Sequence, residues 1–488
     1  MSLVVGQLIS DMERDDLHRE VYRTQGRLTS CFGYDSMGRK AWQYATTLPA
    51  EKLSQIQNPL IKPERYVEHA YNPVHRRYEY DPAGELSRTL DKLRGETQYE
   101  YEANGQLLAR NTGRVVDGEE FRYAAANRLN FNTSRFDHVK DNRLKQWANH
   151  EYKYDAWGNL IEKVVGIVRW QTFTYDCENR LVKTETMAGT QVESTSSYQY
   201  DSLGRRVAKQ SEIKGRTDHK RFLWQGLRML REESPGQSSL YLYEPGSYAP
   251  LARVDEKEGE LENKVYYFHT DQIGTPLEMT DAEGQIVWQA KYRAWGAVEK
   301  LVVNEVEQNL RFQGQYFDVE TGLHYNTFRY YDPEIGRFIT QDPIGLLGGD
   351  NLYIYASNPN VWVDPWGLCG DNVKWGNHLR KIGGGAAPAG MRNPHAHHIV
   401  FKEGRGKLMK AYLSKSKAIL EKHDIDWYKG KENPIWAPNK GHTTANAKKV
   451  YDALENADAG GLGTRSDVVS ALRKMGQHFA DETIDLLP

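Results

Sequence analysis

The last quarter of the chain holds side chains that could bind a metal ion and activate a water molecule. His395, His397 and His398 stand within four residues, and His442 is followed at the i+4 position by Asn446. A neutral imidazole can accept a proton near neutral pH or bind a divalent cation, and an amide oxygen can also bind a cation. A lone histidine is more often structural, but this grouping favours hydrolysis of a phosphodiester.

The segment around these residues is strongly basic. Residues 392–449 carry 13 Lys and Arg against five Asp and Glu, although the whole chain has a formal net charge of -2. Such a segment attracts the phosphates of nucleic acids in a salt-dependent way. We expect Lys448 and Lys449 to contact phosphate or to face solvent.

Helices and short strands are needed to position these side chains. The predicted elements are a strand entered at 395–400, a helix at 406–422, a loop and short strand at 429–441, a helix at 442–457 and a capped helix from Ser466. The inward face of the first helix is expected to carry Leu408, Tyr412, Leu413, Ile419 and Leu420.

The spacing of the histidines raises a question about their geometry. His442 and Asn446 would share one face of the second helix, since they are one turn apart. Adjacent residues of a regular strand point to opposite faces. His397 and His398 can therefore serve one site only if the backbone departs from ideal extension, whereas His395 and His397 would share a face.

Two aspartates before this region stand in matching pentapeptides. DPIGL (342–346) and DPWGL (364–368) are separated by 17 residues. Two carboxylates that share one proton can hydrolyse a peptide bond, because one activates water while the other protonates the carbonyl oxygen. Asp-Pro-x-Gly is also favourable turn chemistry, so a purely structural role for Asp342 and Asp364 is the alternative.

The long N-terminal region is a repeat of the form aromatic-x-Tyr-Asp-x-x-Gly-x-Leu. Its copies are YDSMGR (34–39), YEYDPAGEL (78–86), YEYEANGQL (99–107), YKYDAWGNL (152–160), FTYDCENRL (173–181) and YQYDSLGRR (198–206). Alternating aromatic residues predict half-buried strands, and Asp followed by Gly predicts a tight turn. Hairpin units of this kind bury their faces by stacking on their neighbours. We therefore expect an all-β region from residue 30 to about residue 330.

This repeat resembles the YD repeats of Rhs, teneurin and Tc-toxin proteins. The segments YYFHTDQIGTPLEMTDAEGQIVWQAKYRAWG (266–296) and GLHYNTFRYYDPEIGRFITQDPIGLLGGDNLYIYASNPNVWVDPWGL (322–368) strengthen the resemblance. It implies a β-cocoon, here a partial one or a fragment, that carries a C-terminal toxin. It also implies that Asp342 and Asp364 form an aspartyl autoprotease dyad that cuts between Leu368 and Cys369.

The C-terminal motifs HAHHIV and NPIWAP…GHTTAN…Y resemble the AHH subgroup of HNH, or His-Me finger, nucleases. This resemblance implies that His397, His442 and Asn446 are metal ligands and that His398 is the general base. It assigns Asn433 to orienting that base. An Asn oxygen beside imidazoles suits Mg²⁺ or Mn²⁺, with Zn²⁺ or Ni²⁺ as alternatives. Which of the neighbouring histidines at 395, 397 and 398 takes which role stays open.

Charge and composition divide the chain near residue 368. Residues 369–488 carry 19 Lys and Arg against 13 Asp and Glu, and only three of the 30 tyrosines lie there. The fold class expected is multidomain, with an all-β YD-repeat sheet followed by a small α+β (ββα-metal) domain. The expected parts are an unassigned segment at 1–29, the YD-repeat shell at 30–330, the core signature with the autoprotease at 331–368, a linker at 369–394 and the nuclease at 395–488.

These resemblances together imply an Rhs-family antibacterial effector whose released domain is a metal-dependent DNase. The implied partners are DNA, a cognate immunity protein that we expect to be acidic, and secretion or adaptor proteins, with type VI secretion as the expected route. A ribonuclease with the same site, or an adhesive YD-repeat protein with an inactive tail, are the alternatives. Three distant cysteines and no long apolar run indicate neither a disulfide framework nor a membrane span. We expect a cytoplasmic protein in the producer, exported without a Sec signal and acting in the target cytoplasm.

Overall fold

The computed structural model divides the chain into two compact units. They are the shell unit, Met1–Asp371, and the C-terminal unit, Asn372–Pro488. The division falls three residues beyond Leu368, inside the predicted linker. The structure describes residues 2–4, 7–48, 72–114, 117–124, 127–130, 136–138, 142–166, 168–348, 351–368, 394–401, 406–425, 427, 432–438, 443–481 and 483–486.

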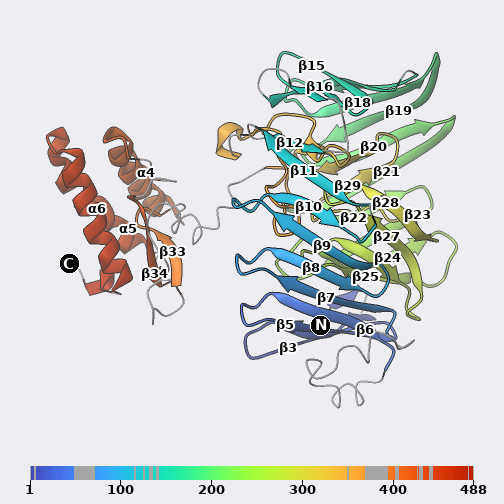
Figure 1. Ribbon diagram of the computed structural model, residues 1–488, viewed down its shortest axis with the longest axis horizontal. Helices are drawn as coiled ribbons and strands as arrows, with labels where there is room; N and C mark the ends of the chain where they lie inside the picture. The colour runs from blue at the N-terminus through green and yellow to red at the C-terminus, as the bar shows by residue number, and fades with distance from the viewer. Residues whose placement is uncertain are drawn as a thin grey trace. The chain divides into compact units, whose positions relative to one another are not determined.

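The shell unit is built of antiparallel strands that follow one another in chain order, as predicted (Figure 1). A two-stranded sheet contains β1 (Ser2–Val4) and β2 (Gln7–Ser10). The ten-stranded sheet contains β3 (Met12–Arg14), β4 (Glu20–Gln25), β5 (Leu28–Tyr34), β6 (Lys40–Thr46), β7 (Val74–Tyr80), β8 (Leu86–Asp91), β9 (Gly95–Tyr101), β10 (Leu107–Asn111), β11 (Glu119–Ala124) and β12 (Asn127–Asn130).

A second, longer sheet and a small one complete the shell unit. The sixteen-stranded sheet contains β13 (Phe136–His138), β14 (Leu144–Trp147), β15 (His150–Tyr154), β16 (Leu160–Val165), β17 (Arg169–Tyr175), β18 (Leu181–Ala188), β19 (Gln191–Tyr200), β20 (Arg206–Ile213), β21 (Arg216–Gln225), β22 (Arg228–Ser234), β23 (Gln237–Tyr243), β24 (Pro250–Lys257), β25 (Lys264–Thr270), β26 (Pro276–Thr280), β27 (Ile286–Tyr292) and β28 (Val298–Asn304). The four-stranded sheet contains β29 (Tyr316–Asp318), β30 (Leu323–Asn326), β31 (Arg329–Asp332) and β32 (Arg337–Phe338), and a 3₁₀ turn, η3 (Gly345–Gly348), follows it.

Each YD phrase forms the end of one strand and the turn that leads to the next. In the turn after β17, Asp176 Oδ1 accepts hydrogen bonds from the backbone N–H of Glu178 and Arg180, at 2.9 and 3.0 Å. The Nε of Arg180 donates to Asp176 Oδ2 at 2.7 Å. The hydroxyl of Tyr175 donates to the carbonyl of Leu160 at 2.7 Å, which ties this hairpin to the one before it.

The same tyrosine bond recurs along both long sheets. It joins the hydroxyl of a YD tyrosine to a carbonyl just after the preceding turn in the pairs Tyr34–Glu20, Tyr80–Lys40, Tyr101–Leu86, Tyr123–Leu107, Tyr200–Leu181 and Tyr243–Met229. A tyrosine suits this position because its ring packs in the core while its hydroxyl finds a backbone acceptor. Each repeat therefore fixes its distance from the preceding hairpin through this tyrosine bond.

The sheet begins earlier in the chain than the predicted start at residue 30. Strands β3 and β4 lie in the segment 1–29 that had no assigned structure. Their turn uses Asp15, whose Oδ1 accepts from the N–H of Leu17 and Arg19 at 3.0 and 2.9 Å. His18, at φ 61°, occupies the left-handed position that a glycine takes in most of the repeats. The phrase was missed because it lacks both the tyrosine and the glycine.

The last part of the shell unit packs against both long sheets. Asp318, fully buried, binds the guanidinium of Arg206 at 2.6 and 3.1 Å and Lys209 Nζ at 3.0 Å. On the other sheet, Asn358 Nδ2 donates to Glu85 at 2.7 Å. Buried charges of this kind require paired partners, so the residues after β28 and the two long sheets must assemble together.

The C-terminal unit is a small α+β domain, in agreement with the predicted fold class. Its elements are β33 (Pro394–His398), α4 (Gly406–Lys422), β34 (Pro434–Pro438), α5 (Thr444–Asp458), η5 (Ala459–Gly461), α6 (Arg465–Ala480) and η6 (Ile484–Leu486). Strands β33 and β34 pair antiparallel without a register shift. Within the described residues, none of the helices has the length and apolar character required to cross a membrane.

Two details of the predicted helices are wrong. Leu408 was expected on the inward face of α4, but it is 60% exposed while Met409 is buried. Helix α5 begins at Thr444, and the Thr443 side chain caps it by accepting from Asn446 N. The helix was predicted to begin at His442, which lies outside the described residues, so its pairing with Asn446 stays a prediction.

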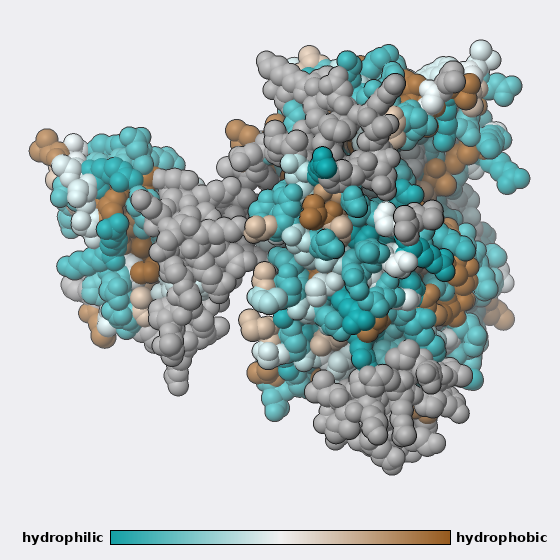
Figure 2. Space-filling view, in the orientation of Figure 1, coloured by the Kyte–Doolittle hydropathy of each residue, from teal (hydrophilic) through white to brown (hydrophobic). Residues whose placement is uncertain are grey.

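The core of the C-terminal unit joins the end of β33 to the helices. Ile399, Val400 and Phe401 are each at most 2% exposed and belong to this core. A Cβ added to Gly476 of α6 would lie 2.6 Å from Ile399 Cδ1, so the helix approaches this segment closely. The described surface in Figure 2 is mainly hydrophilic, with hydrophobic residues in small separate groups.

Candidate active sites

The structure brings the two predicted aspartates of the shell unit to one arginine. Asp342 Oδ2 lies 3.0 Å, and Asp364 Oδ2 lies 3.6 Å, from Nη2 of Arg329. Arg329 begins β31, and its guanidinium carbon lies 3.6 Å from the centre of the Phe338 ring. All three side chains are buried, so the two carboxyl groups face the same guanidinium in a water-poor site.

Both aspartates also perform the turn role that was considered as their alternative. Asp342 Oδ1 accepts from the N–H of Ile344 at 3.0 Å, and Asp364 Oδ1 accepts from the N–H of Leu368 at 3.0 Å. The Oδ2 atom of each is the one that faces Arg329. One oxygen shapes the turn while the other lies in the shared site, so the structural and chemical roles are compatible.

The electrostatics of this site distinguish the two carboxyls. Burial raises the pKa of Asp364 above its ordinary value, and the negative charge of Asp342 adds to this effect. Arg329 and the backbone donors at Leu368 and Trp366 act in the opposite direction without reversing it. Asp364 therefore keeps its proton to a higher pH than an exposed aspartate does.

The segment that leads to the predicted scissile bond is held along the turn between β30 and β31. Asn326 Nδ2 donates to the carbonyl of Asp364 at 2.9 Å, and Phe328 N donates to the carbonyl of Trp366 at 3.1 Å. Arg329 Nε donates to the carbonyl of Gly367. These bonds place Leu368 beside Asp364, whereas Cys369 lies outside the described residues.

Gly367 is required for this arrangement. Its φ is 67°, in the left-handed region, and an added Cβ would lie 2.4 Å from the carbonyl oxygen of Asn326. The second motif can therefore adopt this path only with glycine at its fourth position. Nothing in the sequence had singled out Arg329, because an arginine in a strand rich in aromatic residues has no distinguishing pattern until its burial is known.

In the C-terminal unit, the structure places His398 and Asn433 at neighbouring positions. His398 ends β33 and is 6% exposed, and Asn433 directly precedes β34 and is fully buried. Asn433 Oδ1 accepts from Val400 N at 2.8 Å, and its Nδ2 donates to the carbonyls of Val400 and Trp427, at 3.1 and 2.5 Å. The Asn433 carbonyl accepts from Ile399 N at 3.0 Å.

These bonds show how Asn433 acts on its surroundings. Its side-chain amide binds the backbone of Val400, on the C-terminal side of His398, and the carbonyl of Trp427. The backbone bonds hold the peptide that carries His398 in one place as it leaves the strand. The role available to Asn433 is thus to position the histidine through its backbone.

The predicted metal ligands are described only in part. Asn446 is fully buried in the first turn of α5, and its Nδ2 donates to Asp485 Oδ1 at 2.8 Å. The His397 side chain and all of His442 lie outside the described residues, although the backbone of His397 belongs to β33. Asp485 was not singled out from the sequence, because it lies 39 positions from Asn446.

Lys448 and Lys449 each have partners within the unit. Lys448 Nζ lies 2.5 Å from Asp452 Oδ2 in an exposed pair along α5. Lys449 Nζ donates to the carbonyl of Ile484 at 3.2 Å, so it fastens α5 to the final turn of the chain. Their predicted contact with nucleic acid remains a prediction.

Comparison with known proteins agrees with this architecture. The family model described as the teneurin YD-shell matches residues 77–352. A double-stranded DNA deaminase toxin of Burkholderia cenocepacia is 43% identical, over 75% of this chain and 26% of its own length. A probable deoxyribonuclease, RhsA of Dickeya dadantii, is 33% identical over 60% of this chain and 21% of its own length.

A solved structure shares the fold. The Tc holotoxin pore of Photorhabdus luminescens superposes with a TM-score of 0.56 at 18% identity, over 75% of this chain and 19% of that one. The chain thus spans about a fifth to a quarter of the length of these proteins. Because the matching family model covers more than half of the sequence and contains most of the tyrosine-linked hairpins described above, the chain belongs to the teneurin YD-shell family.

Proposed function

We propose that the C-terminal unit is a metal-dependent endonuclease that acts on DNA and that the shell unit releases it by cutting the chain after Leu368. The observation that carries the nuclease proposal is the binding of the Asn433 side chain to the backbone beside His398. Among the described residues, the buried Asn433 amide makes three hydrogen bonds to main-chain groups, and such bonds leave the neighbouring residue little freedom. Nucleophilic water must be deprotonated from a fixed direction, so a general base benefits from such support.

The relatives support a toxin but do not decide its chemistry. Their names give different activities, a DNA deaminase and a probable deoxyribonuclease. The share of this chain that they match, 60–75%, is no greater than the share that the shell unit occupies. A shell can therefore be common to relatives whose toxins differ, and the activity must be argued from the C-terminal unit itself.

The described residues fit the proposed cation at one position. The amide nitrogen of Asn446 is held by Asp485 at 2.8 Å, which fixes the orientation of the amide oxygen as a candidate ligand. His397 and His442 would supply the imidazoles. An oxygen ligand beside imidazoles is compatible with Mg²⁺ or Mn²⁺. When bound, the cation would neutralise the charge that develops on the phosphate.

The protein's own groups would act as follows. His398 would accept the proton of the attacking water, and Asn433 would keep the histidine in place through the Val400 backbone. The basic residues of the unit would attract the phosphate backbone. In the described part of α4, Lys407, Lys410 and Lys415 form no ion pair and stand exposed, so they are available for such contacts.

DNA is preferred to RNA as the substrate for two reasons. A relative that is 33% identical is named as a probable deoxyribonuclease. In addition, no row of aromatic residues able to stack single-stranded bases was evident in the C-terminal sequence. Ribonuclease activity of the same site is the outcome that would replace this proposal if DNA is not cut.

The cleavage proposal rests on the position of Asp364 next to Leu368. Asp364, the carboxyl with the raised pKa, would protonate the carbonyl oxygen of the scissile peptide, while Asp342 would activate the water. Arg329 holds both carboxyls in one site. As an Rhs-type effector, the protein would be delivered by a contact-dependent route such as type VI secretion, and its producer would need an immunity protein, for which an acidic surface fits best.

A plasmid-cleavage assay on the purified full chain tests the nuclease. We expect nicking in Mg²⁺ or Mn²⁺ that stops with EDTA and falls at least a hundredfold in His398→Ala. His423→Ala is the matched control, because His423 bonds Asp458 at the opposite end of α5 from Asn446. Intact plasmid with wild-type protein in every metal tried, or equal loss in both variants, would contradict the assignment.

A further inference from the structure

A cavity of about 110 Å³ lies between the two long sheets of the shell unit. Its walls come from β7 to β10, from the turn after β25, from the end of β27 and from the chain around Asn360. This space is several times what a single buried water needs, so it suits a ligand of a few heavy atoms. The charged side chains that line it are five basic ones, Arg76, Arg94, Arg110, Lys291 and Arg293, and two acidic ones, Asp91 and Asp271.

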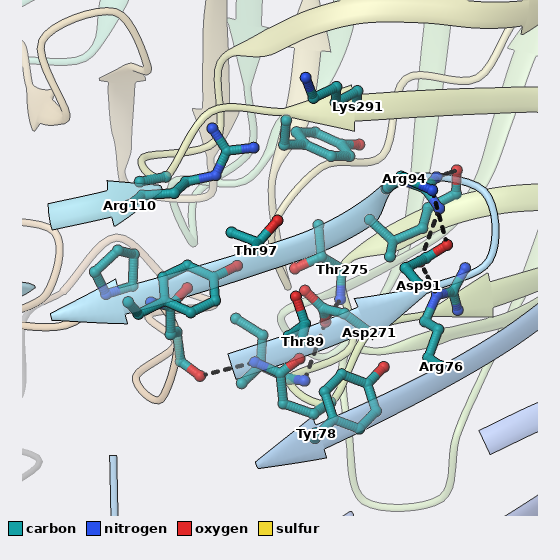
Figure 3. Close-up of a pocket in the computed structure, with 18 of the residues that line it drawn as sticks. Arg76, Tyr78, Thr89, Asp91, Arg94, Thr97, Arg110, Asp271, Thr275 and Lys291 are labelled. Carbon is teal, nitrogen blue, oxygen red and sulfur yellow. Dashed lines mark hydrogen bonds and ion pairs between the residues drawn. The ribbon is translucent and has the colours of Figure 1, made fainter. Parts of the chain in front are cut away.

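The two acidic side chains of the lining already have partners. Asp91 binds Arg76 at 2.7 Å and Arg94 at 3.1 Å. Asp271 Oδ1 accepts from two N–H groups of its own turn, at 3.0 and 2.8 Å, and burial raises the pKa of this carboxyl. Figure 3 shows both acids on one side of the lining, whereas Arg110 and Lys291 lie on another. The cavity therefore has a side where the lining is basic.

Arg110 and Lys291 keep hydrogen-bond donors for a ligand. Arg110 is 6% exposed, and its Nη1 binds Glu119 at 3.2 Å, but its Nη2 lies 3.9 Å from Glu299 Oε2, which is too far for a hydrogen bond. Lys291 Nζ binds Asp117 and Glu299 at 3.1 and 3.0 Å, which uses two of its three protons. These three acids stand outside the lining of the cavity.

Arg293 stands at the position that the repeat normally gives to its aspartate. Its N–H donates to the carbonyl of Ala297 at 2.8 Å, and the N–H of Gly296 donates to its carbonyl at 3.0 Å. The turn at Asp201 has the same two bonds. A cation thus replaces the carboxylate of the turn. Arg293 is exposed and, in the part of the chain that the structure describes, forms no ion pair.

The three cations Arg110, Lys291 and Arg293, here called the basic end of the cavity, come from both long sheets. Arg110 belongs to β10 of the ten-stranded sheet, whereas Lys291 and Arg293 stand at the end of β27 and just after it. Glu119 holds the two sides together, because its Oε2 accepts from Arg110 Nη1 at 3.2 Å and from the N–H of Ala294 at 2.9 Å. The basic end therefore lies across the boundary between the sheets.

We propose that the basic end of this cavity binds a small phosphate-type oxyanion, with Arg110, Lys291 and Arg293 as its donors. A phosphate group accepts several hydrogen bonds at once, and its bonds to guanidinium and ammonium groups are charge-assisted. The bound oxyanion connects the two long sheets. Its binding therefore stabilises the assembled shell over the unfolded chain.

Calorimetric titration of the full chain with sodium phosphate, at constant ionic strength in a buffer free of phosphate, tests the proposal. We expect saturable binding and a raised thermal midpoint of the shell unit at saturation. Arg293→Gln should bind at least tenfold more weakly, and it should fold normally because Arg293 is exposed. Arg216→Gln is the matched control and should bind like wild type, because Arg216 is also exposed but does not line the cavity.

A second titration, with glycerol phosphate, identifies the source of the group. Tighter binding of this ester than of inorganic phosphate would assign the site to a phosphomonoester, and equal or weaker binding would assign it to the free ion. Absence of saturable binding of both probes overturns the proposal. Equal affinities of wild type and Arg293→Gln also overturn it, as does an equal rise of the thermal midpoint in sodium chloride of the same ionic strength. These readouts are independent of nuclease activity.

Discussion

Asp342 and Asp364 stand 22 positions apart in the sequence, yet each directs its Oδ2 at the same guanidinium nitrogen of Arg329, at 3.0 and 3.6 Å. Burial raises the pKa of Asp364, so this carboxyl is favoured to keep its proton. The same two residues form the turns of the DPIGL and DPWGL motifs. The pairing is therefore part of the way in which the end of the shell unit folds.

We expect Asp364→Asn to abolish separation of the chain after Leu368. The amide can still accept the Leu368 N–H bond, so the turn survives, but it cannot supply a proton to the peptide carbonyl. Asp342→Asn should have the same effect. Denaturing electrophoresis and intact-mass measurement detect the products. The control variant Asp176→Asn changes an ordinary YD turn and should be cleaved like wild type. Cleavage of both the Asp342→Asn and the Asp364→Asn variant would rule out these two residues as the autoprotease dyad.

Cleavage of the chain and the stability of the folded shell unit should both depend on pH through the titration of Asp364. Its folded-state pKa is raised above the ordinary value of 3.8, mainly by burial, so the folded chain binds a proton more tightly than the unfolded chain. This contribution to stability is fully present below about pH 4 and is lost as the pH rises through the folded pKa. We expect the cleavage rate to fall over the same interval. The measurement is a rate profile of wild type, and a rate that rises there contradicts the proton-donor role.

The buried amide of Asn433 should matter for both stability and activity. Asn433→Ala removes the partners of Val400 and Trp427, and leaving such buried main-chain groups unsatisfied costs about 1–3 kcal/mol. We expect a lower urea midpoint for the C-terminal unit and strongly reduced plasmid cleavage. Ser470→Ala, which removes an exposed bond to Ser466, should change stability by less than about 0.5 kcal/mol. Similar losses of stability and of cleavage in both variants would show that the Asn433 bonds contribute no more than an exposed hydrogen bond.

Two adjacent arginines offer a matched test of the shell core. Arg206 is fully buried beside Asp318, whereas Arg205 pairs with Asp201 in a partly exposed turn. We expect Arg206→Met to destabilise the shell unit by about 3–5 kcal/mol, because it leaves a buried carboxylate with too little positive charge. Arg205→Met should cost less than about 1 kcal/mol. Chemical denaturation of the two variants compares them, and equal costs would disprove the buried-pair argument.

The local rules of the sequence were sufficient for much of this molecule. Alternating aromatic residues and Asp-Gly turns predicted the hairpins, and apolar spacing predicted α4 at 406–422, because these signals act over a few neighbouring residues. The same rules failed at Asp15 and His18, where a turn forms without glycine or tyrosine. They also placed Leu408 in the core in place of Met409. The two residues are adjacent on α4, and the side of the helix that packs against the core decides which of them is buried.

By itself, the sequence determined the repeating β-architecture, the change in composition near residue 368 and the types of side chain available for catalysis. Only the tertiary structure decided which distant groups meet. Arg329 lies between Asp342 and Asp364, and Asp485 accepts a hydrogen bond from Asn446. Asp271 lines a cavity, whereas the aspartate of several other YD turns binds an arginine. The physical reason is that turns and strands are set by local backbone preferences, whereas burial and charge pairing depend on contacts between segments far apart in the chain.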